Sequence, residues 1–171
     1  MSLVRMEIRT IAVGGGPVPS VIVLQPSTDD GEAPSQLPIR IGTVEAMAIS
    51  MGLDPDASER PMTHDLLQSV IESLDATVTA VSIVDVHGTT FYAELTLTTA
   101  SGHVVSIDSR PSDAIALAVR THAPIFAEDD VLKAAALPDF KRVEQNEKEQ
   151  EMERFHDFVE SLSPSDFNLD D

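Results

Sequence analysis

The chain has 171 residues, of which 42% are hydrophobic, and it carries 29 acidic against 11 basic residues for a formal net charge of −18. This length and composition allow one ordinary domain with a packed core, plus an appendage. The absence of cysteine excludes disulfides, thiolate nucleophiles and cysteine zinc sites and favours a reducing compartment, so we expect a cytoplasmic protein. No segment has the apolar length of a signal peptide or a membrane span, so we expect no membrane partner.

The charge excess restricts the ligands that the chain can bind. Nucleic acids are normally bound through many Lys and Arg side chains, which are scarce here. An anionic ligand would therefore be held locally or through a metal ion.

The first half of the chain predicts three strands and then a short apolar helix. A glycine-rich turn that begins at Gly14 joins the first two strands as a hairpin, and a polar loop precedes the third. In chain order these elements cover residues 7–13, 20–24, 36–42 and 43–53.

The second half begins with an amphipathic helix over residues 63–74. Its apolar face consists of Leu66, Leu67, Val70, Ile71 and Leu74. Three β-branched runs with hairpin signals then predict an antiparallel meander. The meander and the helix, short strand and last helix that follow it cover residues 77–86, 90–99, 103–109, 110–120, 124–126 and 129–136.

Each half thus reads as three strands and a helix, and Glu45 aligns with Asp113 when the two halves are laid together. This pattern predicts a duplicated β-β-β-α unit, although short strand-to-helix junctions also look alike by chance. The fold class that we expect is α+β, with a mainly antiparallel sheet and helices packed on it.

The composition changes near residue 139, and the last 33 residues hold eleven acidic and four basic side chains. We therefore divide the chain into a domain over residues 1–138 and an acidic segment over 139–171. Within this segment, Met152, Phe155, Val159 and Leu162 recur at helical spacing. They predict a C-terminal amphipathic helix that docks on its own core, on a second subunit or on a separate protein partner.

Two similar polar clusters stand at predicted helix starts, at residues 60–65 (RPMTHD) and 108–113 (DSRPSD). Helix capping accounts for part of both, since Thr63 suits an N-cap and Pro111 suits the first helical position. Capping does not explain an arginine in each cluster, the histidine in the first or Asp108 in the second. These extra residues favour a functional site.

Helix N-termini with a neighbouring arginine suit the binding of a phosphate oxygen. The substrate-binding candidates are Arg60, Thr63, Arg110 and Ser112. Carboxylates could instead hold Mg²⁺ or Mn²⁺, and the candidates are Asp65, Asp113, Glu45 and Asp108. His64 is a candidate general acid or base, so the catalytic candidates are His64, Asp65 and Asp113.

Four segments in this order and spacing resemble the bifunctional nuclease domain family: LPIRIGTVEAMAI, RPMTHDLLQSVI, GTTFYAEL and DSRPSDAIALAVRTHAPIF. The resemblance covers residues 4–137 and implies an α+β fold, a homodimer and nuclease activity on RNA and DNA. It also implies that Glu45, residues 63–65 and residues 110–113 match the family's motifs. Arg40 departs from the pattern, because family members usually carry a large aromatic residue at this position.

Two functions remain open at this point. The first is a metal-assisted phosphodiesterase. The second is a non-catalytic binding or regulatory module, in which the clusters are caps and buried ion pairs, such as Arg110 with Asp65. A small-anion or nucleotide sensor would use the same arginines without turnover. The nuclease hypothesis requires carboxylates of both clusters to converge in an open cleft, whereas the module leaves them apart or covered by arginine.

Overall fold

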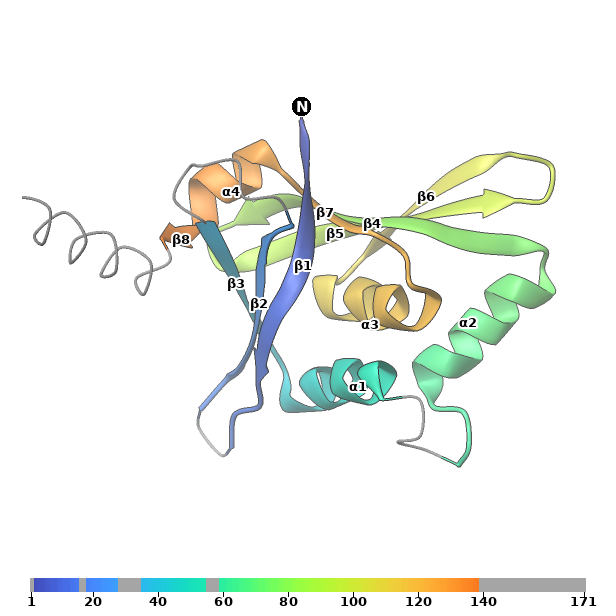
Figure 1. Ribbon diagram of the computed structural model, residues 1–171, viewed down its shortest axis with the longest axis horizontal. Coiled ribbons are helices and arrows are strands. Elements are labelled where there is room, and N and C mark those ends of the chain that lie inside the picture. The colour runs from blue at the N-terminus through green and yellow to red at the C-terminus, as the bar shows by residue number, and fades with distance from the viewer. Residues whose placement is uncertain (1, 16–17, 28–34, 55–58, 139–171) are drawn as a thin grey trace, which may run out of the picture.

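The computed structural model of the protein describes residues 2–15, 18–27, 35–54 and 59–138. Its described strands are Leu3–Ala12 (β1), Ser20–Pro26 (β2), Ser35–Ile41 (β3), Ala76–His87 (β4), Thr90–Thr99 (β5), Val104–Ser109 (β6), Ile125–Glu128 (β7) and Leu137–Pro138 (β8). Its described helices are Thr43–Leu53 (α1), Thr63–Ser73 (α2), Pro111–Thr121 (α3) and Asp129–Ala135 (α4). The fold class is α+β, as the sequence predicted (Figure 1).

The described strands form one twisted sheet in the order β6-β5-β4-β7-β1-β2-β3-β8. Two antiparallel meanders, β1–β3 and β4–β6, lie on either side of the short strand β7. Strand β7 is antiparallel to β1 and parallel to β4, so the sheet is mainly antiparallel. The predicted antiparallel meander is present, and its two turns contain Gly88 and Gly102, which have a positive φ of 62° and 80°.

Helices α1, α2 and α3 lie together below β4–β6 in Figure 1, and α4 lies above them. Helix α3 packs on α1, α2, β4 and β5. All five residues from Ala114 to Ala118 are buried, so α3 is covered on most of its surface. This explains why its sequence is apolar at nearly every position rather than only at helical spacing. The start of α3 is thereby fixed between the sheet and the two other helices.

Helix α2 forms where the sequence predicted it, but its apolar face is not the buried one. Of the five apolar residues on that face, only Ile71 is buried. The other four are exposed, and the helix contacts α3 and β4 through a neighbouring side. The expectation of a helix was therefore right, whereas its apolar pattern does not describe how it packs on its own domain.

The two halves share the order of three strands and a helix, although α2 stands before the second set. A duplicated origin stays a prediction. The segment 139–171, with its predicted amphipathic helix, lies outside the described residues, so the two-part division of the chain also stays a prediction. Among the described helices, none has the length and apolar character to cross a membrane.

Candidate functional site

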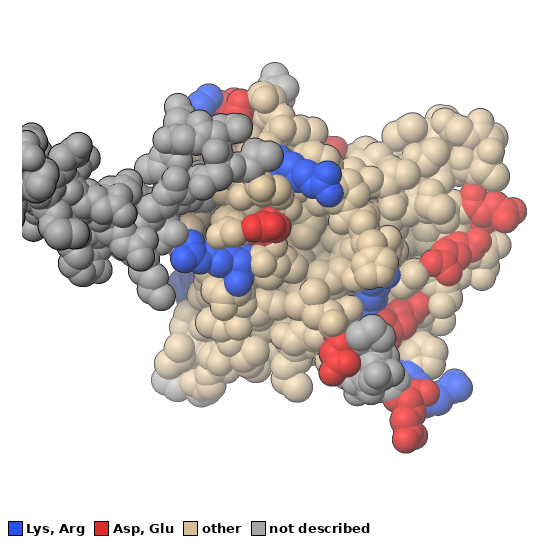
Figure 2. Space-filling model, in the orientation of Figure 1, with Lys and Arg blue, Asp and Glu red and all other residues tan. Residues whose placement is uncertain are grey.

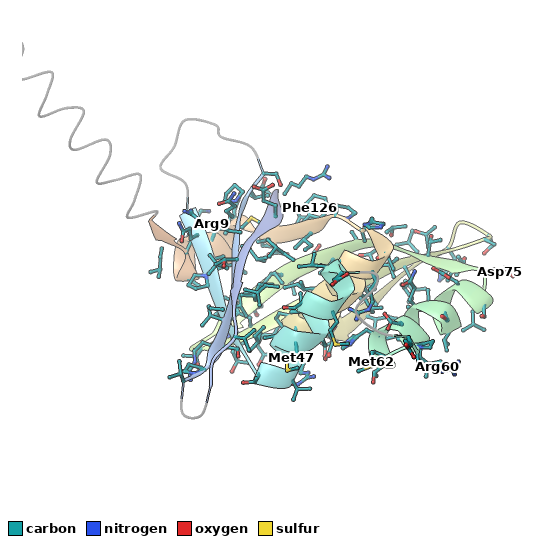
Figure 3. All side chains as sticks on the ribbon, turned by 60° about the horizontal axis from the view of Figure 1, so that its bottom comes forward. Arg9, Met47, Arg60, Met62, Asp75 and Phe126 are labelled. Carbon is teal, nitrogen blue, oxygen red and sulfur yellow. The ribbon has the colours of Figure 1, made fainter. Side chains whose placement is uncertain are left out.

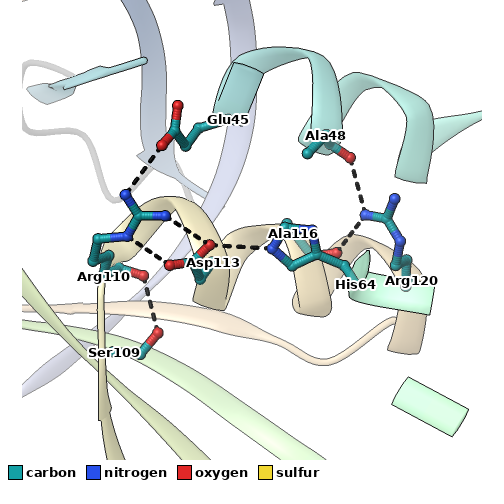
Figure 4. Close-up of polar contacts among 8 residues, drawn as sticks. All are labelled: Glu45, Ala48, His64, Ser109, Arg110, Asp113, Ala116 and Arg120. Atoms are coloured by element: carbon teal, nitrogen blue, oxygen red, sulfur yellow. Dashed lines mark hydrogen bonds and ion pairs between the residues drawn. The ribbon is translucent and has the colours of Figure 1, made fainter. Parts of the chain in front are cut away.

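An arginine joins the starts of α1 and α3. Arg110 is the N-cap residue of α3, and Glu45 lies in the first turn of α1. Arg110 donates from Nη1 to Glu45 Oε1 at 3.0 Å, from Nε to Asp113 Oδ2 at 2.7 Å and from Nη2 to Asp113 Oδ1 at 3.2 Å (Figure 4). Planar, two-point contacts of this kind fix both the guanidinium and the carboxylate. Glu45 and Asp113, which the sequence predicted as site residues, are thus brought together.

His64 connects α2 to the same group. Its Nε2 lies 3.2 Å from Asp113 Oδ1, and its side chain is 14% exposed. The polar chain Glu45–Arg110–Asp113–His64 therefore ties together the first turns of three helices (Figure 4). The second residue of α2 reaches this position because α2 packs on α3. The two predicted clusters meet through His64 and Asp113, but the carboxylate of the first cluster, Asp65, pairs with Arg120 instead of joining Asp113 and Arg110.

A pocket of about 280 Å³ opens beside Arg110. It is bounded by the end of β3, the start of α1, the turn between β4 and β5, and the start of α3. Its polar lining includes Thr89, Thr90, Arg110, Ser112 and Glu45. Neither helix N-cap, Gly42 or Arg110, makes a side-chain capping hydrogen bond. In the first turn of α3, Pro111 has no N–H and the Asp113 N–H donates to the Arg110 carbonyl at 3.1 Å, so the Ser112 amide is the one that this turn offers to a ligand at the pocket.

Ser112 is the most informative residue of this lining. It is only 6% exposed, and its hydroxyl has no hydrogen-bond partner among the described residues. No fully buried side-chain polar atom of these residues lacks a partner, so the Ser112 hydroxyl keeps some contact with solvent, and Ser112 lines this pocket. Buried hydroxyls normally find a partner in the protein or in a ligand or water. This hydroxyl is thus placed to bind a ligand.

The position of Glu45 depends on Gly42. A Cβ atom built on Gly42 would overlap Glu45 Oε2 and lie 2.9 Å from Glu45 Cδ. The carboxylate therefore folds back over the N-cap residue of its own helix, where the positive end of the helix dipole favours a negative charge. The glycine is required here for close approach.

The charges of the site influence one another. Burial raises the pKa of Asp113, but hydrogen bonds from Arg110 and His64 outweigh it and hold this pKa below its ordinary value. The hydrogen bond to Asp113, and then the one to Glu45, raise the pKa of Arg110. Asp113 and Arg110 are consequently both charged over the whole physiological pH range.

Asp65 belongs to a different set of contacts. Its Oδ1 accepts from Arg120 Nε at 2.5 Å and its Oδ2 accepts from the Met62 backbone N–H at 2.7 Å. The bond from Arg120, and then the bond from Met62, lower the pKa of Asp65. Arg110 therefore pairs with Asp113 and Glu45, and the predicted pair of Arg110 with Asp65 is not formed.

Arg120 was not predicted as a site residue from the sequence. Its side chain is 5% exposed, and Nη1 donates to the carbonyls of Ala48 at 3.0 Å and Ala116 at 2.8 Å. It thereby joins α1, α2 and α3 at the end opposite Arg110. An arginine that ends the apolar run of α3 was the available signal, because a cation at such a position must either reach solvent or find a buried carboxylate.

Three further candidates lie apart from Arg110. Thr63 was expected as the N-cap of α2, but the N-cap is Met62, and Thr63 is the first helical residue. The Asp65 carboxylate accepts a hydrogen bond from the Met62 backbone N–H.

Asp108 is exposed on β6 opposite Glu94. Arg60 lines a second pocket of about 470 Å³ with Asp65 and Arg120, and Figure 3 places it beside Met62 at the start of α2.

The predicted metal ligands do not form a cluster. Across the described ranges, no three His, Asp or Glu side chains come together in a way that could hold a metal ion. Asp65 is engaged by Arg120, and Glu45 and Asp113 share Arg110. The donor set as it stands does not fit a resident Mg²⁺ or Mn²⁺.

The fold and this site define an α+β domain whose polar residues meet at the starts of three packed helices. A family model described as "Bifunctional nuclease domain" matches residues 22–139. The chain belongs to this family.

Two proteins of Mycobacterium tuberculosis are similar to the chain, and both are named as uncharacterized. They are uncharacterized protein MT1877 of strain CDC 1551 / Oshkosh and uncharacterized protein Rv1829 of strain ATCC 25618 / H37Rv. Each is 39% identical over 135 residues, which cover 77% of this chain and 80% of the relative.

Proposed function

We propose that the protein is a nuclease that binds a phosphodiester group of RNA or DNA in the pocket between the starts of α1 and α3. The observation that carries the proposal is the unpartnered hydroxyl of Ser112, which lies in the same pocket lining as Arg110 and two helix N-caps without side-chain caps. Backbone amides at helix starts, a guanidinium and a hydroxyl together suit the oxygens of a phosphate. Membership of the family supports the same ligand class.

Arg110 has the exposure that this role requires. Its side chain is 65% exposed, although it contacts Glu45 and Asp113. A bound phosphate would compete with these carboxylates for the guanidinium. Before a phosphate binds, Arg110, Glu45 and Asp113 together carry a formal charge of −1. An acidic chain can bind a phosphate in this way, because the contact needs only a few cationic side chains at a single place on the surface.

His64 is the proton-transfer residue of the proposal, and since it does not line the pocket, it is connected to Arg110 through Asp113. In hydrolysis, a water oxygen forms the new bond to phosphorus and the bond from phosphorus to the leaving sugar oxygen breaks. His64 would take the water proton or supply the proton to the leaving oxygen, and Asp113 would hold the imidazole in position. Positioned acids and bases of this type contribute roughly 10²–10⁴-fold to a rate.

Whether Mg²⁺ or Mn²⁺ assists the hydrolysis is a separate part of the proposal. Of the four expected ligands, Asp65 pairs with Arg120 and Asp108 is exposed on β6. The roles given to Arg110, Ser112 and His64 are independent of a metal ion. Action in the cytoplasm, which the cysteine-free composition favours, belongs to the same proposal.

A non-catalytic binding module is the second candidate, and one observation favours it. Arg110 and Arg120 cover the carboxylates of Glu45, Asp113 and Asp65, which is the arrangement expected of structural ion pairs. Such a module would still bind a phosphate at Ser112 and Arg110, but it would leave the ligand uncleaved.

The test is to incubate the full chain with single- and double-stranded RNA and DNA in the presence of Mg²⁺, Mn²⁺ or EDTA. Arg110→Gln, Ser112→Ala and His64→Gln are compared with Arg5→Gln, which removes the same charge from an exposed position of β1. We expect cleavage by the wild type and the Arg5 control and its loss in the other three. Binding without cleavage would identify the module, and neither binding nor cleavage would overturn both candidates.

A further inference from the structure

Arg40 brings a second arginine to the pocket beside Arg110. It lies near the end of β3, whereas Arg110 and Ser112 lie at the start of α3, so the two arginines line the pocket from different elements. Arg40 is exposed, and within the described ranges its side chain makes neither a hydrogen bond nor an ion pair. The N–H donors of its guanidinium are therefore free to bind an anion at the pocket.

The pocket provides no counter-ion for Arg40. Glu45 is the one carboxylate among the described residues that line the pocket, and its Oε1 accepts a hydrogen bond from Arg110. Arg5 is the other described basic residue whose side chain has no hydrogen bond or ion pair, but it does not line this pocket. Arg40 is consequently a positive charge at the candidate site that the contacts of the described residues leave unused.

Arg110 has little capacity beyond one phosphate. Its Nη1 already donates to Glu45, and its Nε and Nη2 donate to Asp113, so only part of its guanidinium remains for a ligand. Arg110 with its two carboxylates is formally negative, and the charge of Arg40 cancels this excess. A second phosphate would therefore meet a net negative charge without Arg40, and a free guanidinium with it.

The distribution of basic residues makes a free cation at the pocket important. Figure 2 shows the basic side chains of the described residues as small separate groups on the visible face, several of them next to acidic side chains, rather than as one continuous basic surface. A chain with a net charge of −18 is unsuited to hold a nucleotide chain by attraction over a broad surface. Its phosphates must instead be bound at individual cations that are free to contact them, as Arg40 is.

We propose that Arg40 binds a second phosphate of the ligand, next to the phosphate at Arg110 and Ser112, so that the pocket takes two consecutive phosphates of a nucleotide chain. The inference rests on the proposed function, which supplies the first of the two phosphate positions. Pockets for small ligands usually measure about 300–1,000 Å³, and this one measures about 280 Å³. Its volume therefore suits two phosphates and the sugar between them rather than several whole nucleotides.

The experiment compares ligands that differ by a single phosphate. Adenylyl-adenosine carries one phosphate between its two nucleosides, and its 5′-phosphorylated and 3′-phosphorylated forms carry a second. Each is titrated into the full chain in the presence of EDTA, and NMR measures the dissociation constant and shows that the ligand stays intact. Wild type, Arg40→Gln and Arg40→Lys are compared with Arg5→Gln, which removes the same charge away from the pocket. Circular dichroism checks that the variants are folded, which we expect because both positions are exposed.

We expect the added phosphate at one of the two ends to strengthen wild-type binding about tenfold, as a hydrogen-bonded contact between charged groups does. This gain should persist in Arg5→Gln, fall below about twofold in Arg40→Gln and be partly kept in Arg40→Lys, which retains the charge. Ser112→Ala should weaken the binding of all three ligands and keep the gain.

Two results would overturn the inference and leave the proposed function in place. One is an added phosphate that brings no gain in the wild type, and the other is a gain that Arg40→Gln retains. A wild type that binds none of the three ligands would overturn the proposed function and the inference together.

Discussion

His64 Nε2 and Asp113 Oδ1 lie 3.2 Å apart, although the two residues are separated by 49 positions in the chain. Each belongs to one of the two polar clusters that begin α2 and α3. Asp113 also accepts two hydrogen bonds from Arg110. Asp113 is therefore both a first-turn residue of α3 and the link between the starts of α2 and α3. A substitution of Asp113 can be measured separately for its effect on stability and for its effect on activity.

Asp113→Asn keeps the size of the side chain and removes its charge. The variant should be less stable than the wild type by about 1 kcal/mol, because hydrogen bonds to a charged group contribute more than neutral ones and this one is partly exposed. It should also lose any nuclease activity, since His64 and Arg110 lose their common partner. Urea unfolding and RNA cleavage measure the two effects, and an active Asp113→Asn variant would contradict the role given to His64.

The acid sensitivity of the fold should depend on Asp65 and Asp113. Both have a pKa lowered below the ordinary value, so their ionised forms stabilise the folded state. This contribution is complete above the unfolded pKa of about 3.9 and is lost as the pH falls through the lower folded pKa. The free energy of unfolding should therefore decrease below about pH 4, and the decrease should be shallower in Asp65→Asn. An equally steep decrease in that variant would contradict the prediction.

Gly42→Ala should disturb the site without changing a charged residue. The new methyl group would occupy the space of the Glu45 carboxylate, so Glu45 must move away from Arg110. We expect weaker phosphate binding or altered cleavage with a small loss of stability. Gly15→Ala is the control, because nothing lies within 4 Å of a Cβ atom at that position. Equal behaviour of the two variants would show that the position of Glu45 is unimportant.

Gly52→Ala should destabilise the contact between α1 and α3. A Cβ atom at Gly52 would overlap Arg120 Nη1 and lie 2.7 Å from Val119 Cγ2. Overpacking of this kind costs about 1–3 kcal/mol, and the measurement is the free energy of unfolding against the same Gly15→Ala control. Since Gly52 is remote from the Arg110 pocket lining, the ligand affinity of the folded protein should not change.

The sequence predicted most helices and strands because the local sequence signals agree with the structure that each segment adopts. Helix α1 covers the predicted residues 43–53, and Pro111 begins α3 as expected. Alternating strands, positive-φ glycines at hairpin turns and a proline at the first helical position are local signals. They need no knowledge of the tertiary structure, so most elements could be identified, whereas β1 begins at Leu3 rather than at residue 7 and β8 was not predicted.

The contacts of the site could be predicted only in part. The two clusters were identified, but the partner of each carboxylate depends on how three helices pack. Arg110 takes Asp113 and Glu45, and Asp65 takes Arg120, which stands at the other end of α3. The exposure of the apolar face of α2 was hidden for the same reason, because apolar spacing predicts an apolar face and does not say what covers it.

Ser112→Ala is the most direct test of the proposed ligand site. The hydroxyl has no partner among the described residues, so its removal should leave the free energy of unfolding unchanged within about 0.5 kcal/mol. The binding of single-stranded RNA, measured by fluorescence anisotropy at low salt, should weaken about tenfold or more, as expected when a hydrogen bond to a charged ligand is lost. Wild-type affinity in a fully stable Ser112→Ala variant would contradict a phosphate site at this pocket.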